Sequence, residues 1–345
     1  MAQKLLSICI KVSTIFIFML IFQSANAQYN FSQVDALLQQ NQKQLGKDIV
    51  TLVYKDGKVV YSKEMGDFKA NTVELIASCS KWLTAALVMQ FVDEGKLSLD
   101  DYASKYLPDM TKYGKGYITI RQCLSHTTGI HGERGLAGIF KLTRYSTLEE
   151  EVNDFISKNE LDAPPGKEFR YSSVGLNIAG RVLEVISKKS FDRLAQDKLF
   201  RPLGMRNSTF SSGKAPNPSG GARSTASDYM NFLVMILNKG MFNGKRILSE
   251  QSVAIMQQAV TNAGMIKYAP PTADGFNYAL GEWVLEQDTN GKSTAVSSPG
   301  LFGTWPMVDN TRGYASIIFV KTLLNEQKKD IYINIKQAID KAVAK

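Results

Sequence analysis

The stretch from Leu75 to Val92 is the feature that most restricts how this chain can fold. Lys81 is its one charged residue, and it stands among mostly apolar side chains. A helix that is apolar on nearly every side is a buried helix, so the pattern predicts a central helix enclosed by other elements. A lone lysine near the first turn of such a helix is energetically costly unless it has a partner or a chemical task.

Ser78 lies three residues before Lys81, so the two side chains face the same side of the first helical turn. A serine hydroxyl is a weak nucleophile unless a base lies within reach. Burial and the positive helix N-terminus both lower the pKa of a lysine, which then accepts a proton near neutral pH. Ser78 is therefore a candidate nucleophile and Lys81 its candidate base. On these residues alone the alternative is a helix cap followed by a buried lysine that pairs with a distant carboxylate.

The order of strand-like and helical patterns predicts an α+β fold. Asp56-Gly57 between two apolar runs predicts an early β-hairpin, and helical periodicity dominates from about Leu75 to Val260. The expected helices are Phe31–Leu45, Ser80–Glu94, Leu148–Lys158, Val174–Ile186, Phe191–Leu199, Ser227–Asn238, Ser249–Val260 and about Glu326–Val343. The expected strands are Ile49–Tyr54, Val59–Ser62, Ala279–Glu286, Thr304–Val308 and Tyr314–Val320.

A two-stranded hairpin is marginally stable alone, so we expect the early hairpin to join the late strands in one antiparallel sheet. The first and last helices would flank this sheet, and the helical middle would be an inserted, mostly helical lobe. The expected boundaries are an α/β lobe at about 28–76 and 262–345 and a helical lobe at about 77–261, within one catalytic domain at 28–345. A crevice between two such lobes is a natural ligand site.

The first 27 residues have the pattern of a cleaved secretory signal peptide. Lys4 and Lys11 precede or border an uncharged run over residues 12–22, and Ala-Asn-Ala at 25–27 suits a signal peptidase. The alternative, a membrane anchor, needs about 20 apolar residues. We therefore expect an exported protein, periplasmic or secreted, without a stable membrane anchor. Loss of both lysines lowers the net charge from +9 to +7, and the scattered lysines that remain indicate a solvated surface, not a nucleic-acid site.

Several blocks of sequence resemble the motifs of one enzyme family, in the same order along the chain. The first catalytic motif is matched at 78–81, the "LLxHTSGL" stretch at 118–130, the "PGxxFxYSN" motif at 165–173, and two further blocks at 202–205 and 220–226. From about residue 48 to 320 the chain thus resembles the serine β-lactamase and penicillin-binding-protein superfamily. The likeness is greatest to its class C-like branch of β-lactamases, D-alanyl-D-alanine peptidases and esterases.

The resemblance implies a β-lactamase/transpeptidase-like fold and acyl transfer to Ser78 followed by hydrolysis, without a cofactor. Lys81 and Tyr171 would share the proton transfers. Tyr171 fits this task, because a phenolate held near a lysine can act as a base and then return the proton to the leaving group. The expected partner is a small-molecule or peptide substrate.

Two positions depart from the family's motifs. Ser173 stands where the second motif usually ends in asparagine, and Ser298 stands at the first position of the usual Lys-Thr-Gly or His-x-Gly. A serine there has no positive charge, and a charge-assisted bond to a substrate carboxylate contributes roughly 1.5–3 kcal/mol. The resemblance assigns Ser173, Ser298, Gly300 and Leu301 to substrate binding, with the N–H groups of Leu301 and Ser78 as oxyanion donors. These departures favour an esterase or amidase whose leaving group is less charged.

Two other functions stay open. The first is a β-lactamase or D-alanyl-D-alanine carboxypeptidase, which would take its cation from Arg223 or Arg134 instead. The second is a non-catalytic penicillin- or peptide-binding module on the same fold, and the changes at Ser173 and Ser298 are its basis.

The remaining candidate motifs have structural interpretations. His126 is expected to hold a loop through hydrogen bonds, and His131 with Glu133 is expected to belong to a polar loop, not to a metal site. The segment Glu149–Asn153 is interpreted as a solvated helix face. Cys79 points away from Ser78 around the helix, so core packing is its expected role.

Overall fold

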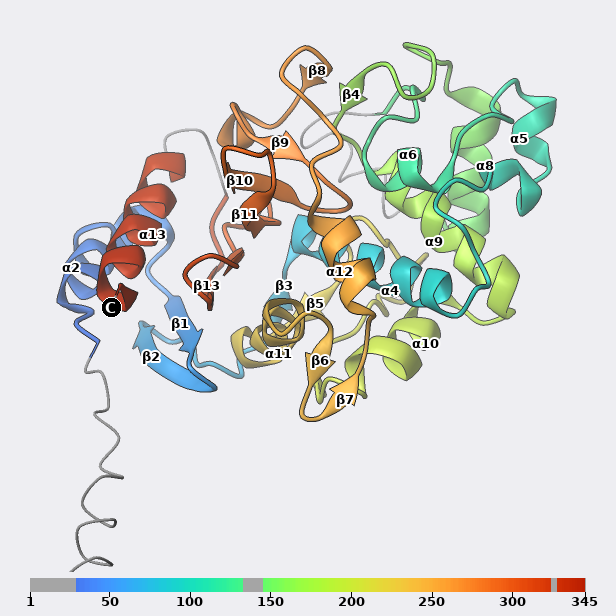
Figure 1. The fold of residues 1–345 in the computed structure, drawn as a ribbon. Coiled ribbons are helices and arrows are strands. Elements are labelled where there is room, and N and C mark those ends of the chain that lie inside the picture. Colours follow the sequence, from blue (N-terminus) through green and yellow to red (C-terminus); the bar gives the residue numbers. More distant parts are fainter. Residues whose placement is uncertain (1–28, 133–144, 324–327, 345) are drawn as a thin grey trace, which may run out of the picture.

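The computed structural model describes residues 29–132, 145–323 and 328–344, and it confirms the predicted α+β architecture (Figure 1). Within these residues, seven strands form one antiparallel sheet in the order β2-β1-β13-β12-β11-β10-β9. They are β1 (Ile49–Lys55), β2 (Lys58–Met65), β9 (Asn277–Tyr278), β10 (Trp283–Gln287), β11 (Ser293–Ser297), β12 (Trp305–Asp309) and β13 (Tyr314–Val320). As expected, the early hairpin joins the late strands: β1 pairs with β13 from Ile49 opposite Val320 to Lys55 opposite Tyr314.

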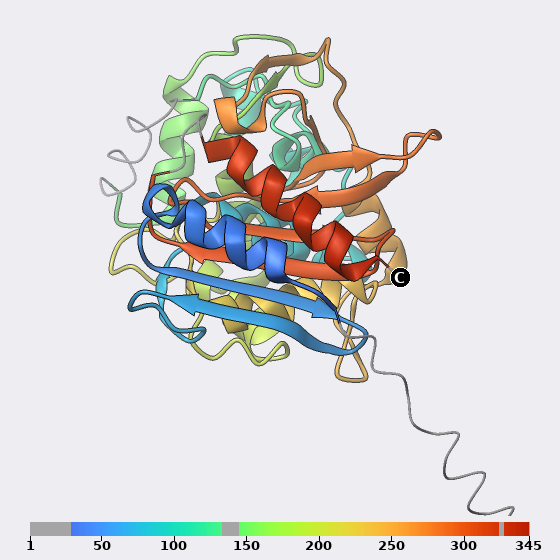
Figure 2. The same ribbon diagram turned by 90° about the vertical axis from the view of Figure 1, so that its left-hand side faces the viewer.

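Helices from the two ends of the chain cover one face of the sheet (Figure 2). They are α2 (Ser32–Gln40), α3 (Gln42–Leu45) and α13 (Lys329–Val343). Their buried side chains form an apolar cluster with β1, β12 and β13, in which the Trp305 and Tyr332 rings stack with centroids 4.6 Å apart. The predicted flanking helices are therefore confirmed, although the first is divided at Asn41.

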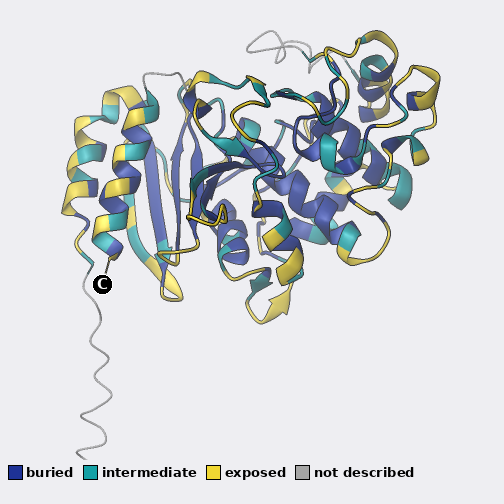
Figure 3. Ribbon diagram, turned by 45° about the horizontal axis from the view of Figure 1, so that its top comes forward, coloured by how far each residue is buried: buried dark blue, intermediate teal, exposed yellow. Residues whose placement is uncertain are grey.

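The other side of the sheet packs on the helical part of the molecule, and α4 (Ser80–Asp93) runs through its interior. Every residue of α4 from Ser80 to Phe91 is buried, which confirms the enclosed helix that its apolar sequence predicts. Its neighbours include α9 (Val174–Ser187) and α12 (Glu250–Gln257). Figure 3 shows the buried core continuing from the sheet into these helices, with exposed residues on the outer faces.

Helix α11 (Ala226–Leu237) links the two parts of the fold. It lies within the stretch assigned to the helical lobe, yet it packs against β1, β12 and β13. The boundaries of the two lobes therefore stay a prediction.

The remaining elements are β3 (Glu74–Leu75), η1 (Ala77–Cys79), η2 (Ala103–Lys105), α5 (Asp109–Lys112), α6 (Ile120–Leu124), α8 (Leu148–Lys158), β4 (Phe169–Arg170), α10 (Phe191–Ala195), η3 (Gln196–Phe200), β5 (Arg223–Ser224), β6 (Met241–Phe242), β7 (Lys245–Arg246), β8 (Ile266–Tyr268) and η4 (Pro271–Ala273).

Some of the sequence-based predictions concern residues outside the described ranges. The signal segment at 1–27, together with Glu133 and Arg134, lies outside the described residues. In the described ranges, no helix is both long enough and apolar enough to cross a bilayer.

Candidate active site

The Ser78 hydroxyl is presented by a short turn, η1, directly before α4. Ala77 takes a left-handed conformation, with φ of 45°, which is strained for a residue with a Cβ atom. The turn leaves Ser78 half-buried and places the Cys79 thiol in the core, 3.5 Å from the carbonyl oxygen of Thr304. Burial raises the pKa of that thiol, so Cys79 is an inert core residue, as expected.

Lys81 is buried and points at Ser78. Its Nζ atom lies 3.0 Å from Ser78 Oγ and donates to the carbonyl oxygen of Ser219 at 2.8 Å. Burial lowers the pKa of Lys81 to about 7. Among the described residues no carboxylate forms an ion pair with this amine, so the alternative of a lysine held by a distant acidic partner finds no such partner there.

Tyr171 joins Ser78 and Lys81 from a segment far along the chain. Its side chain forms a hydrogen bond with Ser78, and Lys81 Nζ lies 4.7 Å from the centre of its ring. Burial raises the pKa of Tyr171 above its ordinary value, while the Ser78 hydrogen bond acts in the opposite direction. The side chain is therefore a neutral phenol at neutral pH, and Lys81 has the pKa closer to that of a working base.

Aromatic side chains and His126 hold Tyr171 in place. The His126 and Trp283 rings lie 4.5 and 5.4 Å from the Tyr171 ring, centre to centre. His126 Nδ1 accepts from the backbone N–H of Ser172 at 3.4 Å, so Nε2 is the protonated nitrogen that faces the Tyr278 hydroxyl at 3.0 Å. Burial lowers the pKa of His126, which keeps it neutral. These bonds agree with the loop-holding role expected for His126.

The third motif lies against the Ser78 turn. The Ser298 hydroxyl is buried, 3.0 Å from the carbonyl oxygen of Gly281 and 3.3 Å from that of Ser78, so it is bound to backbone. At Gly300 a Cβ atom would lie 2.3 Å from the carbonyl oxygen of Ile76, so only glycine permits this close approach. The motif thus tethers the turn that carries Ser78.

Two backbone N–H groups stay free for a ligand at this junction. Neither Ser78 nor Leu301 donates its N–H in a hydrogen bond within the described part of the chain. They are the two groups that the resemblance assigns as oxyanion donors. Ser173, the other predicted substrate-binding residue, is half-buried and precedes α9 as its N-cap without a side-chain cap bond.

Sequence reasoning missed three buried polar residues, Ser219, Asn177 and Glu151, that lead away from Lys81 through hydrogen bonds. Asn177 Oδ1 accepts from the N–H of Ser219 at 3.0 Å, and Asn177 Nδ2 donates to Glu151 Oε2 at 3.1 Å. The interpretation of Glu149–Asn153 as a solvated face is wrong at Glu151, which is only 3% exposed. Its place next to buried Val152 in an amphipathic helix was the available signal.

The other candidate groups behave as polar surface. His131 lies next to Asp162, with Nδ1 3.1 Å from Oδ1, and both residues are exposed. Among the described residues, no cluster of His, Cys, Asp and Glu is arranged to hold a metal ion. Arg223 is half-buried and forms no ion pair with a described residue, and its strand pairs with β3, just before the Ser78 turn.

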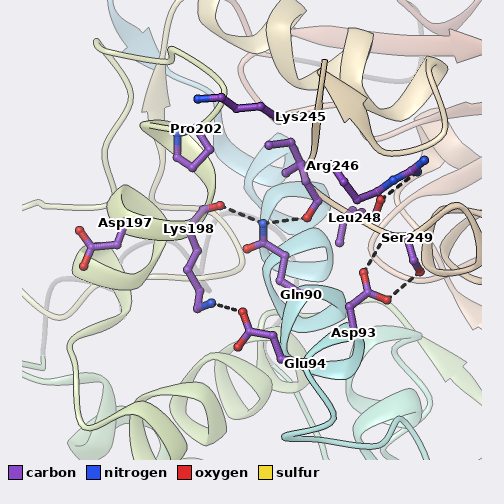
Figure 4. A pocket seen from close by; sticks show the side chains of 11 residues that line it. Gln90, Asp93, Glu94, Asp197, Lys198, Pro202, Lys245, Arg246, Leu248 and Ser249 are labelled. Carbon is purple, nitrogen blue, oxygen red and sulfur yellow. Dashed lines mark hydrogen bonds and ion pairs between the residues drawn. The ribbon is translucent and has the colours of Figure 1, made fainter. Parts of the chain in front are cut away.

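An open groove lies at the far end of α4 (Figure 4). Its lining includes Gln90, Asp93 and Glu94 from the end of that helix, with Lys198 and Ser249 opposite. None of Ser78, Lys81 and Tyr171 lines it. The groove is therefore separate from the candidate active site.

The seven-stranded antiparallel sheet, its covering helices and the enclosed helix α4 define the class of protein as an α+β, β-lactamase/transpeptidase-like fold. The β-lactamase family model matches residues 34–338, and the chain belongs to this family of serine hydrolases. Penicillin-binding protein 4 of Amycolatopsis lactamdurans is 31% identical over 242 residues, covering 60% of this chain and 62% of that protein. Protein flp of Staphylococcus aureus MW2 is 31% identical over 170 residues, 46% of this chain and 34% of that protein. The chain thus matches less than two thirds of the length of either relative.

Solved structures show the same fold. A candidate β-lactamase from Bacteroides dorei DSM 17855 superposes with a TM-score of 0.82 at 29% identity, covering 91% of this chain and 99% of that one. EstCE1, a hydrolase with promiscuous acyltransferase activity, gives a TM-score of 0.74 at 21% identity, covering 89% and 97%. A family VIII carboxylesterase gives 0.76 at 17% identity, covering 90% and 97%. The last two likenesses concern the fold alone.

Proposed function

We propose that the chain is a serine hydrolase that forms an acyl-enzyme on Ser78. The proposal is carried by Lys81, a buried amine 3.0 Å from Ser78 Oγ that has no ion-pair partner among the described residues. A buried ammonium without a counter-ion is unstable, so a large share of the molecules hold the neutral amine near pH 7. A neutral amine at this distance accepts the hydroxyl proton as the serine oxygen attacks.

The protonation states define the order of proton transfers. Ser78 Oγ attacks the acyl carbon while Lys81 takes its proton, and the N–H groups of Ser78 and Leu301 stabilise the oxyanion. The Tyr171 phenol gives its proton to the leaving group and regains one from Lys81. Water then attacks the acyl-enzyme, Lys81 takes a proton from this water by way of Tyr171, and Ser78 recovers a proton as it leaves. Tyr171 acts here as a proton relay, which differs from the phenolate base expected from sequence.

We propose esters or amides with an uncharged leaving side as the substrates. The Ser298 hydroxyl is bound to the carbonyl oxygens of Ser78 and Gly281, and its position supplies no cation. A substrate carboxylate at this point would lose its hydration without gaining a charged partner, which is unfavourable. The TM-scores of 0.74 and 0.76 to EstCE1 and a family VIII carboxylesterase are compatible with this class.

Arg223 favours a second candidate function, a β-lactamase or D-alanyl-D-alanine carboxypeptidase. It is a half-buried cation, it forms no ion pair with a described residue, and its neighbour across the strands is Leu75, three residues before Ser78. A guanidinium that forms no ion pair with a described residue, on a strand next to the segment before Ser78, would suit a substrate carboxylate. A panel of short acyl esters, amides, penicillins and D-alanyl peptides separates the two. Faster turnover of the esters supports our proposal, and efficient penicillin turnover that falls in Arg223→Ala supports the second.

The catalytic claim itself is tested by labelling with a fluorophosphonate probe. We expect one adduct per chain on wild type, mapped to Ser78 by peptide mass spectrometry, and none on Ser78→Ala. A folded wild type without an adduct and without turnover would favour the third possibility, a non-catalytic binding module.

We also propose that the chain is exported. The support is the pattern of residues 1–27, with lysines before or at the border of an uncharged run and Ala-Asn-Ala at its end. N-terminal sequencing of protein expressed with its own first residues should begin at Gln28, outside the cytoplasmic fraction. A cytoplasmic product that begins at Met1 would contradict this.

A further inference from the structure

A buried polar chain leads away from Lys81. The carbonyl oxygen of Ser219 accepts from Lys81 Nζ at 2.8 Å, and the N–H of the same residue donates to Asn177 Oδ1 at 3.0 Å. Asn177 Nδ2 then donates to Glu151 Oε2 at 3.1 Å. The chain thus connects α8, α9, the Ser219 loop and α4, and all four residues are buried.

The two ends of the Asn177 amide fix its orientation. Its oxygen can only accept and its nitrogen can only donate, so the N–H of Ser219 and the carboxyl of Glu151 determine which way the amide faces. Asparagine has a low helix propensity, and this one is fully buried in the interior of α9. A buried amide in that position needs both bonds, because either one left unmade leaves a desolvated polar atom.

Glu151 is the outer end of the chain. Burial raises its pKa to about 7, while the Asn177 hydrogen bond acts in the opposite direction. It forms no ion pair within the described ranges. Either protonation state leaves a carboxyl oxygen that can accept from the Asn177 amide, so the bond persists across neutral pH.

The Ser219 residue has a second anchor. Asn217 Oδ1 accepts from the N–H of Ser219 at 3.1 Å and from its hydroxyl at 2.7 Å. Thr84 Oγ1 in α4 also donates to the carbonyl oxygen of Pro218 at 2.6 Å. Loss of Asn177 therefore loosens the Ser219 carbonyl without releasing it, and the expected effect is smaller than that of losing Lys81.

We propose that Asn177 and Glu151 are positioning residues for Lys81. They hold the Ser219 peptide, and the Ser219 carbonyl oxygen keeps the Lys81 amine directed at Ser78 Oγ. The inference rests on the proposed acyl-enzyme function. Neither residue contacts Ser78 or Tyr171 in the described contacts, so they should affect the rate of acylation and leave substrate affinity unchanged.

The test compares three variants with a matched control. Asn177→Leu removes both amide bonds at similar volume, Glu151→Leu removes the outer acceptor, and Glu151→Gln keeps an acceptor without a titrating carboxyl. Asn231→Leu is the control, since Asn231 is a helix asparagine in α11 that donates to the carbonyl oxygen of Leu203 at 3.0 Å, outside this chain of bonds. The readouts are the fluorophosphonate labelling rate of Ser78, and kcat and KM for the best ester of the panel.

A small displacement of a catalytic group costs up to about 10²-fold in rate, so we expect Asn177→Leu to slow labelling and kcat by about 10- to 100-fold. KM should stay within about twofold, because the substrate contacts are unchanged. Glu151→Leu should slow both rates by roughly 3- to 10-fold, and Glu151→Gln should restore them to within about twofold of wild type. Asn231→Leu should lower the Tm without slowing labelling of the folded protein.

Two results would overturn the inference. The first is a folded Asn177→Leu that is labelled at the wild-type rate, and the second is a Glu151→Gln that is as slow as Glu151→Leu. If Asn177→Leu does not fold, the two Glu151 variants decide the question alone. A wild type that is never labelled refutes the proposed function instead, so the two failures are distinguishable.

Discussion

Two lysines, one near each end of α4, are in opposite electrostatic situations: Lys81 belongs to its first turn, and Lys198 belongs to η3, beside its last turn. At the first turn, Lys81 is buried, its partners are a hydroxyl and a backbone carbonyl, and burial lowers its pKa to about 7. Past the last turn, Lys198 is half-buried at the edge of the groove and forms an ion pair with Glu94 (Figure 4). There, Asp93 also accepts from the N–H and the hydroxyl of Ser249, each at 2.7 Å.

The difference between the two lysines is one of burial and of the charge beside each amine. A half-buried lysine beside a carboxylate forms an ion pair that contributes little to stability. A buried amine without a counter-ion loses its proton near neutral pH and can take another from a neighbouring hydroxyl.

Exchange of each lysine for methionine is the most direct way to break the contrast. A general base contributes about 10²–10⁴-fold, so Lys81→Met should slow fluorophosphonate labelling of Ser78 by about 10³-fold. Lys198→Met removes a cation of similar length at the other end of the helix and should change the rate by less than about twofold. Equal losses in both variants would contradict the account.

Removal of the Tyr171 hydroxyl should have the next largest effect. Tyr171→Phe keeps the ring between His126 and Trp283 but removes the group that hydrogen-bonds to Ser78. Since a proton relay to the leaving group is worth about 10²-fold, ester kcat should fall by that amount. In the acylation step, measured as the first turnover, an ester with an acidic leaving group, such as a nitrophenol, should be affected much less. Equal losses of the acylation rate on both kinds of ester would refute the proton transfer from Tyr171 to the leaving group.

The same contrast predicts a change in stability for the Lys81 variant and little change for the Lys198 variant. The folded pKa of Lys81, about 7, lies below its ordinary value of 10.5, so the unfolded chain binds more protons between these limits and stability rises with pH across them. Lys81→Met should therefore stabilise the fold at and below pH 7, by about 1–3 kcal/mol after the loss of two hydrogen bonds. The gain should shrink as the pH rises towards 10. Lys198→Met should leave stability within about 1 kcal/mol, and urea unfolding at several pH values measures both.

Local patterns made much of the fold predictable from sequence. Asp56 and Gly57 take the positive φ values of 49° and 81° that a tight hairpin turn requires, and the predicted helix at 148–158 has the observed bounds of α8. Strand β11 was missed, since Ser293–Ser297 is rich in serine and threonine. It lies between β10 and β12, and the Ser297 hydroxyl is satisfied by the carbonyl oxygen of Pro306, a contact that no local pattern contains.

In the candidate site, too, local contacts could be predicted from the sequence and long-range contacts could not. Ser78 and Lys81 are three residues apart, so one helical turn suffices to predict their contact, and their roles stay a prediction until they are tested. The bonds of Lys81 to Ser219, Ser219 to Asn177 and Asn177 to Glu151 span 138, 42 and 26 residues. Only the tertiary fold brings these groups together, which explains why sequence reasoning placed Glu151 on a solvated surface.

The pH dependence of Ser78 labelling tests the central claim most directly. The labelling rate of the folded wild type should rise with pH through a single transition with a midpoint near pH 7, because the neutral Lys81 amine is the base. The transition should be absent from the residual labelling of Lys81→Met. A midpoint near 10, the ordinary range for a solvated lysine, or an unchanged profile in Lys81→Met would contradict the account.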